Sequence, residues 1–252
     1  MAAPEIRVYG LDGIPEVRPG DDLVELIAKA FEQSDIGLLD EDVVVITQKV
    51  VSKAEGRLVE LATVEPSALA VTYAEQYDKD PRLVEVVLRE SRRVVRMERG
   101  VMITETRHGF VCANAGVDNS NVPGEKVVCL LPVDPDRSAR QIRDGLKARL
   151  GAAPAVIISD SFGRPWRKGI TNVAIGVAGM EVFADYRGIT DPSGHDLRVT
   201  IMAVADELAA TAELVHGKID GRPVAVIRGY DYPRGDGRAT DLVLEAEKDL
   251  FR

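Results

Sequence analysis

Residues 155–169 have the sequence AVIISDSFGRPWRKG, in which an apolar run leads directly into a charged segment. The run at 155–159 predicts a buried strand, because it has no polar alternation. Two similar runs, VVVIT at 43–47 and VAVI at 224–227, predict further buried strands. Helical patterns separate these strands, so the sequence indicates a sheet with helices packed on it.

Apolar residues at helical spacing predict the helices. We expect them over 21–33, from Pro81 onward with Val94 on the apolar side, over 136–150, over 199–215 and at the acidic C-terminus. Strand-like pieces at 101–104, 110–112 and 127–133 have connections too short for crossover helices, so they are expected to pair antiparallel. The expected fold is α+β, with mixed and largely antiparallel sheets, as a single domain over 1–252 that can divide into two intertwined lobes.

The charge balance limits the partners of this protein. Among 252 residues, 32 Lys and Arg stand against 41 Asp and Glu, which gives a net charge of −9. This charge argues against nonspecific binding to nucleic acid or to a membrane surface. An anionic ligand would have to be met by a local basic cluster or by a metal ion.

The remaining composition indicates a cytoplasmic protein. Two cysteines, Cys112 and Cys129, cannot form a disulfide framework. No apolar stretch reaches the roughly 18 residues of a membrane span, and the N-terminus lacks the pattern of a signal peptide.

Several common catalytic motifs are absent from the sequence. It has no Walker phosphate loop, no glycine-rich Rossmann turn and no G-x-S-x-G elbow. It also has no H-E-x-x-H or C-x-x-C pair, and its three histidines lie far apart. These absences argue against a P-loop enzyme, a nicotinamide enzyme and a zinc site.

The charged end of the opening stretch is the first candidate site. Asp160 and Ser161 supply hard oxygen ligands suited to Mg²⁺ or Mn²⁺. Arg164, Arg167 and Lys168 then place three positive charges close together on an acidic protein. A carboxylate-bound metal beside cations is suited to a polyphosphate. The alternative is a strand end followed by a solvated basic loop.

A second candidate is HGFVCANAGVDNSN at 108–121, which combines small residues, amides and a carboxylate. Asp118 could provide a second carboxylate for the metal at Asp160. The alternative is an Asx-rich turn in which Asp and Asn cap their own backbone. Cys112 lies in an apolar run and is expected in the core, and His108 has no identifiable partner.

A third candidate is TQKVVSKAEGR at 47–57, which follows the VVVIT strand. Lys49 and Lys53 are four residues apart and could contact phosphates as point charges. The alternative is that both lysines lie on a solvated helix face.

Five blocks together resemble one known family. They are IPEVRPGDDL at 14–23, DEDVVVITQKVVSKAEGR at 40–57, HGFVCANAGVDNSNVPGE at 108–125, SDSFGRPWRKG at 159–169 and GKIDGRPVAVIRG at 217–229. In this order they resemble the coenzyme F420-0:L-glutamate ligase family over nearly the whole chain. The resemblance implies a stand-alone ligase of a family-specific, non-P-loop fold, built as a homodimer and without a C-terminal nitroreductase-like domain.

The resemblance also implies the substrates. GTP would drive the addition of L-glutamate to the lactyl carboxylate of a deazaflavin precursor, followed by a γ-linked glutamate. Mg²⁺ or Mn²⁺ would be required, and K⁺ is a further candidate ion. We expect the carboxylate to be activated as an acyl phosphate, because a free carboxylate does not condense with an amine in water.

Site residues follow from the matching blocks. Those implied to contact the nucleotide are Ile14, Pro15, Glu16, Val17, Gln48, Lys53, Asn121 and a loop at 216–223. Those implied to bind the metal are Asp118, Asp160 and Ser161. Lys218 departs from members that place a metal-binding Gln there. Either the second ion is bound differently here, or Lys218 supplies positive charge near the phosphates.

We therefore predict a catalytic set of Asp118, Asp160, Arg164, Arg167 and Lys168, in which the last three supply positive charge. The sequence provides no compelling general base for the glutamate amine. Two alternatives are a metal-dependent phosphohydrolase and a catalytically silent nucleotide-binding protein.

Overall fold

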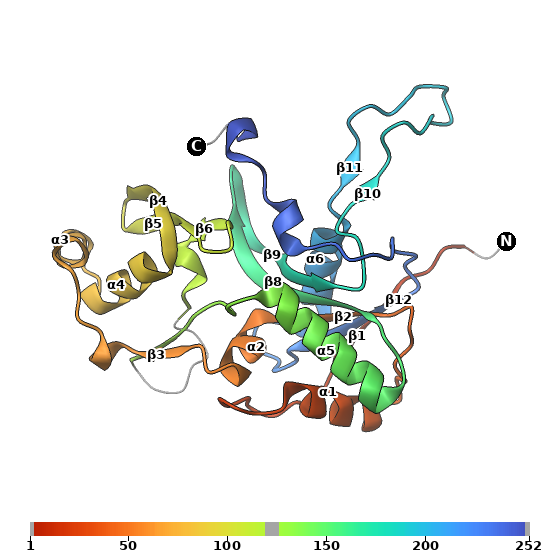
Figure 1. Ribbon diagram of the computed structural model, residues 1–252, viewed down its shortest axis with the longest axis horizontal. Coiled ribbons are helices and arrows are strands. Elements are labelled where there is room, and N and C mark those ends of the chain that lie inside the picture. Colours follow the sequence, from red (N-terminus) through yellow and green to blue (C-terminus); the bar gives the residue numbers. More distant parts are fainter. Residues whose placement is uncertain (1–2, 119–125, 250–252) are drawn as a thin grey trace.

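The computed structural model describes residues 3–118 and 126–249, and its centre is a five-stranded mixed sheet (Figure 1). The strand order is β1-β12-β2-β8-β9, in which β2 and β8 are parallel and the other neighbours antiparallel. These strands are β1 (Arg7–Leu11), β2 (Val43–Thr47), β8 (Ala155–Arg164), β9 (Arg167–Ala178) and β12 (Val224–Arg228). The observed fold is α+β, as the sequence predicts.

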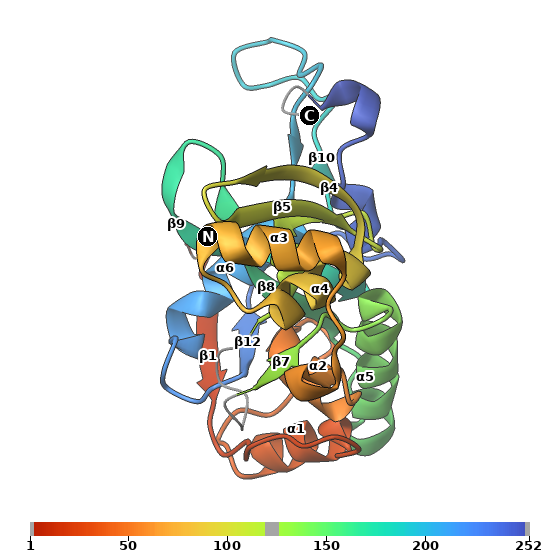
Figure 2. The same cartoon turned by 90° about the vertical axis from the view of Figure 1, so that its left-hand side faces the viewer.

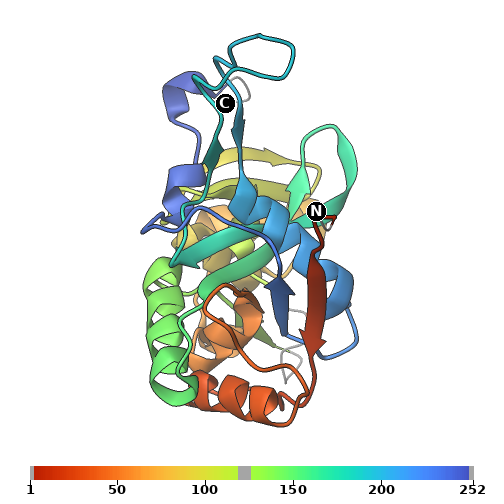
Figure 3. The same ribbon diagram turned by 90° about the vertical axis from the view of Figure 1, so that its right-hand side faces the viewer.

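Helices cover both faces of this sheet, which explains its apolar strands. The covering helices are α1 (Leu23–Glu32), α5 (Pro135–Leu150) and α6 (Val204–His216), and a short helix α2 (Gln48–Ala54) follows β2 directly. The helix α5 packs on β8 and β9 with α1 beside it, whereas α6 packs on β1, β9 and β12 (Figure 3). Residues 43–46 and 155–158 have no solvent exposure. A strand covered on both faces buries every side chain, so it has no polar alternation.

A second lobe is built from the middle of the chain (Figure 2). It contains β3 (Leu58–Glu60), η1 (Leu61–Thr63), α3 (Ala68–Tyr77), α4 (Pro81–Glu90), β4 (Ser91–Glu98), β5 (Val101–Thr106), β6 (Val111–Ala113), η2 (Asn114–Gly116) and β7 (Val127–Cys129). The strands β4, β5 and β6 form an antiparallel sheet, and β3 pairs antiparallel with β7. Two small cores of its own stabilise this lobe.

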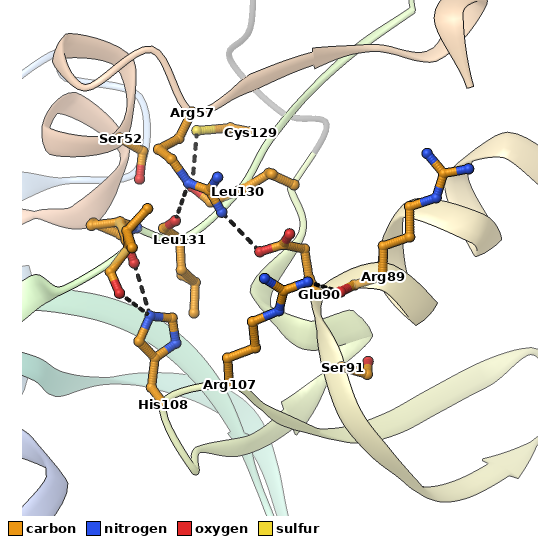
Figure 4. Close-up of polar contacts among 12 residues, drawn as sticks. Ser52, Arg57, Arg89, Glu90, Ser91, Arg107, His108, Cys129, Leu130 and Leu131 are labelled. Atoms are coloured by element: carbon orange, nitrogen blue, oxygen red, sulfur yellow. Dashed lines mark hydrogen bonds and ion pairs between the residues drawn. The ribbon is translucent and has the colours of Figure 1, made fainter. Parts of the chain in front are cut away.

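Polar contacts at the base of α4 join the second lobe to the chain around the central sheet (Figure 4). The Arg57 guanidinium donates to the Leu131 carbonyl oxygen at 2.9 Å and to Glu90 at 2.8 Å. Within the second lobe, Arg107 donates to the Arg89 carbonyl oxygen at 2.8 Å. A guanidinium that contacts a carbonyl and a carboxylate from different elements fixes their spacing.

Three predicted helices differ from the structure. The helix expected over 199–215 begins only at Val204, because 201–202 form strand β11 (Ile201–Met202) against β10 (Ala184–Asp185) in a projecting arm (Figure 1). The helix from Pro81 ends at Glu90, and Val94 belongs to β4, whose pairing with β5 replaces the helical hydrogen bonds. The C-terminal segment forms only the short turns η3 (Ala239–Leu242) and η4 (Ala246–Lys248).

The topology brings several loops to one edge of the sheet. Because β2 and β8 are parallel, both end at this edge, where Thr47 lies opposite Ser159. The antiparallel β12 begins there, with Val224 beside both Ile46 and Leu11. Segments after β1, β2 and β8 and before β12 therefore converge, in the position where open sheets bind ligands.

Candidate functional site

A cavity of about 870 Å³ lies at this edge of the sheet. Its described lining residues come from the segment after β1, from α2, from the turn after η2, from β8 and β9, and from the end of α6 with the loop that follows. Four are basic and four are acidic: Lys49, Lys53, Lys218, Arg222, Glu16, Asp118, Asp160 and Glu213. These charges balance formally, so on a protein of net charge −9 the cavity is less negative than the protein as a whole, and its four cations are available to meet an anionic ligand.

The helix α2 presents its predicted residues to the cavity. Lys53 is only 5 % exposed, and its Nζ lies 2.5 Å from Glu16 Oε1. Gln48 is buried and accepts a hydrogen bond from Ser52 at 2.8 Å. Lys49 is mostly covered and pairs with Asp118. The two lysines therefore do not form a solvated helix face, which was one of the two interpretations of their spacing.

Asp118 reaches the same cavity from the second lobe. Its backbone pairs with Cys129 through two hydrogen bonds, of 3.0 and 2.8 Å, and its Oδ2 lies 2.8 Å from Lys49 Nζ. The turn before it has positive φ at Asn114, Ala115 and Gly116. A Cβ at Gly116 would lie 2.8 Å from the Leu131 side chain, so glycine is required for this close approach.

Asp160 and Ser161 lie where β8 leaves the core. Burial raises the pKa of Asp160 to about 6, against hydrogen bonding by the Ser161 amide, and the nearby charge of Asp118 adds to the rise. Lys49 and Lys218 act in the opposite direction. A cation bound beside Asp160 would offset the repulsion between its charge and that of Asp118. The structure thus brings Asp118 and Asp160 together, while their role as metal ligands stays a prediction.

Residues of the loop at 216–223 and of the segment at 14–17 line the same cavity, and their contact with a nucleotide stays a prediction. Gly217 ends α6 with a φ of 60°, and a Cβ there would collide with Asp220. Lys218 lines the cavity near enough to lower the pKa of Asp160. Asn121, the remaining predicted nucleotide contact, lies outside the described residues.

The basic cluster Arg164, Arg167 and Lys168 is not among the residues that line the cavity. A solvated basic loop was the alternative interpretation of this segment. In the structure, β8 and β9 continue past the sheet as a hairpin, whose exposed tip carries these cations (Figure 2). Arg164 donates a hydrogen bond to the Lys168 carbonyl oxygen within the tip. The structure therefore places this cluster outside the residues that line the cavity with Asp160, while its catalytic role stays a prediction.

Among the polar residues that line the cavity, Ser159, Asn172 and Glu213 were not proposed as site residues from the sequence. His216 was considered as one of three distant histidines and as the first residue of the predicted nucleotide loop at 216–223, but not as a partner of Glu213. A Glu and a His three residues apart in the last turn of a helix share one face, and this spacing could have identified Glu213 and His216 as neighbours in the site. Asn172 has no comparable signal, because only the β8–β9 register places it beside Ser161.

The donor set fits a hard divalent cation. Mg²⁺ uses few carboxylates and keeps its other positions for water and phosphate oxygens. Asp118, Asp160 and the Ser161 hydroxyl offer such a set, whereas the described residues contain no group of three His, Cys, Asp or Glu placed to hold a metal ion. A zinc-type site is therefore not found in this part of the chain.

Comparison with known proteins agrees with this geometry. A family model described as F420-0:Gamma-glutamyl ligase matches residues 13–229. The chain belongs to this family. The residues that line the cavity from 14 to 223 all lie within the matched range.

Similar proteins cover the chain almost completely. The coenzyme F420:L-glutamate ligase of Methanopyrus kandleri is 47 % identical over 99 % of this chain and 98 % of its own length. That of Methanothermobacter thermautotrophicus is 46 % identical over 98 % and 99 %, respectively. The protein of the same name from Methanocaldococcus jannaschii is 41 % identical. In the described part of the chain, no helix is long and apolar enough to cross a membrane.

Proposed function

We propose that this protein is a GTP- and divalent-metal-dependent ligase that adds L-glutamate to coenzyme F420-0 and then adds a γ-linked glutamate. The observation that carries the proposal is the meeting of Asp118 and Asp160, from different lobes, in one cavity with Lys49, Lys53 and Lys218. The names of the similar proteins supply the substrate class.

The chemistry requires activation of a carboxylate. Its oxygen attacks the γ-phosphorus of GTP, the bond from that phosphorus to the bridging oxygen breaks, and GDP leaves. The acyl phosphate then reacts with the glutamate amine to form the amide, and inorganic phosphate leaves. Such phosphoryl transfers depend mainly on positioning and charge stabilisation.

The cavity lysines are placed for these two tasks. Lys53 is buried, so its ammonium group has a fixed position from which to meet a phosphate oxygen. Lys49 now neutralises Asp118, and can turn to the triphosphate when a cation takes its place. Asp118, Asp160 and Ser161 would hold a divalent ion, which supplies charge neutralisation between phosphate oxygens when bound.

Mass spectrometry of the deazaflavin acceptor tests the proposal. We expect its mass to rise in glutamyl steps with GTP, Mn²⁺ and L-glutamate, and to stay unchanged when any one is omitted. ATP in place of GTP is expected to yield little product. Phosphate release without glutamate would instead indicate a phosphohydrolase, and nucleotide binding without product would indicate a silent binding protein.

We include in this proposal the homodimer and the cytoplasmic location that the resemblance implies. Light scattering of the purified protein tests the dimer, and cell fractionation tests the location.

A further inference from the structure

Glu213 differs from the other carboxylates of the cavity in its charge environment. Glu16 and Asp118 each pair with a lysine, whereas Asp160 has no Lys or Arg within 4 Å among the described residues and is assigned to the proposed metal site. Glu213 lines the same cavity, its side chain is 36 % exposed, and no Lys or Arg of the described residues lies within 4 Å of it. Among the described residues, Glu213 is therefore a cavity carboxylate that has neither a cationic side-chain partner nor a place in the proposed metal site.

A chain of hydrogen bonds holds Glu213 in place. The Ser161 hydroxyl donates to Asn172 Oδ1 at 2.7 Å, and Asn172 Nδ2 donates to Glu213 Oε2 at 2.9 Å. Asn172 is buried, so this relay has little freedom. It fixes one oxygen of Glu213 and leaves Oε1 without a partner from the described residues.

Two buried polar side chains that line the same cavity as Glu213 also lack hydrogen-bond partners among the described residues. His216 is 2 % exposed, and neither ring nitrogen makes a hydrogen bond; its Nδ1 lies 3.9 Å from Glu213 Oε2. Burial lowers the pKa of His216, against the effects of Glu213 and the Val45 backbone, so the neutral ring does not compensate the carboxylate. The Ser159 hydroxyl is buried and equally without a partner. Unsatisfied polar groups that line a cavity point to a polar ligand.

We propose that Glu213 binds the ammonium group of the incoming L-glutamate and accepts its proton through Oε1. This inference rests on the proposed ligase function. It names a general base for the glutamate amine, for which the sequence provides no compelling candidate. An ammonium group supplies the positive charge that Glu213 lacks and three donors, of which one can reach Oε1. The relay to Ser161 keeps this amine site beside the proposed metal ligands.

The reaction at this site balances as follows. Glu213 removes one proton from the ammonium group, and the freed electron pair forms the bond from nitrogen to the acyl carbon. The bond from that carbon to the phosphate oxygen then breaks. The second proton of the nitrogen leaves with inorganic phosphate, and Glu213 returns its proton to water.

Hydroxylamine separates amine activation from phosphoryl transfer. It is largely uncharged at neutral pH, and it converts an acyl phosphate to a hydroxamate without needing a proton acceptor. The experiment compares wild type, Glu213→Gln and Glu207→Gln with GTP, Mn²⁺ and acceptor, adding either L-glutamate or hydroxylamine. Gln at 213 keeps an oxygen for Asn172 but removes the charge. Glu207 is an exposed residue of the same helix and serves as the matched control.

For Glu213→Gln we expect kcat/KM for L-glutamate to fall about 100-fold or more, a typical contribution of general-base catalysis. We expect its hydroxamate rate to stay within about threefold of wild type, and Glu207→Gln to match wild type in both assays. Unchanged glutamate ligation by Glu213→Gln, or an equal loss of both products, would overturn the inference. If wild type forms hydroxamate or amide in neither assay, the proposed function itself fails.

Discussion

The strand β8 carries two polar groups only four residues apart, and they have different fates in the fold. Asp160 lies in the cavity at the sheet edge, where burial and Asp118 raise its pKa to about 6. Arg164 lies on the exposed hairpin tip, where it donates a hydrogen bond to the Lys168 carbonyl oxygen within the same tip. Both residue types are suited to phosphate chemistry, but only the first is placed where other segments converge.

This difference shows that the position along a strand decides what a polar residue can do. At the sheet edge, α2, the turn after η2 and the loop after α6 surround Asp160. A few residues further on, β8 pairs with β9 alone, and solvent surrounds the hairpin. Water screens charges there, so their effect on a distant phosphate is small.

The largest effect is expected at the cavity end of β8. Asp160→Asn removes a carboxylate from the proposed metal site and should lower kcat/KM for ligation about 1,000-fold or more, because metal-ion catalysis contributes several kcal/mol. Asp144→Asn, on the exposed side of α5, is the matched control and should retain wild-type activity. Near-normal ligation by Asp160→Asn would show that the cavity end of β8 is no more important for activity than its hairpin tip.

A smaller effect is expected at the opposite wall of the cavity. Lys53→Met should weaken GTP binding about 10- to 100-fold, because a charge-assisted contact contributes roughly 1.5–3 kcal/mol and Glu16 would lose its partner. Calorimetric titration with GTP measures this change, with the exposed Lys147→Met as the control. Equal affinities of the two variants would show that the phosphates lie elsewhere.

In the metal-free protein, Asp160→Asn should raise the stability of the fold, although it lowers the ligase activity. Burial raises the pKa of Asp160 from 3.8 to about 6, so the folded protein holds the charged carboxylate at a cost above about pH 6. Below about pH 4 the carboxyl is neutral in both the folded and the unfolded protein, and the cost disappears. Solvent at this half-buried side chain screens part of the free energy that corresponds to the pKa shift. Asp160→Asn should therefore stabilise the protein by roughly 1–2 kcal/mol at pH 7.5.

Thermal unfolding in EDTA at several pH values measures this effect. We expect the melting temperature of Asp160→Asn to exceed that of wild type by about 2–5 °C at pH 7.5. The difference should decrease as the pH falls towards 4. A difference that stays constant with pH would show that ionisation of Asp160 is not its cause.

The smallest effect is expected at the hairpin tip. Replacing Arg164, Arg167 and Lys168 together by alanine should change kcat/KM by less than about threefold, as for exposed residues outside a site. The assay is the same ligation reaction, at low and at high salt. A large, salt-sensitive loss would show that the hairpin reaches a substrate and that the two ends of β8 act together.

Much of the central sheet could be predicted, because buried strands have a distinctive composition. The runs at 43–47, 155–159 and 224–227 all proved to be strands of one sheet, and the helix at 136–150 was found within one residue. The errors lie where pairing replaced local preference. Ile201 and Met202 fit a helical period, but they pair with Ala184 and Asp185 instead.

Local pattern and resemblance together named most of the lining residues of the site. They could not show that Lys49 and Lys53 are covered, nor that the cations at 164–168 lie away from the cavity. Solvent exposure depends on which other segments pack nearby, and residue types alone do not contain this information.

The sequence by itself determined that the protein has buried strands, packed helices and a supply of carboxylates and lysines at strand ends. Only the tertiary structure decided which of these groups meet. The parallel pairing of β2 with β8 sets Lys49 and Asp160 at one edge, the contacts of Arg57 join the lobe of Asp118 to the body, and the β8–β9 register places Asn172 between Ser161 and Glu213. The physical reason is that side-chain identity is local, whereas distance between charges is set by long-range pairing of the backbone.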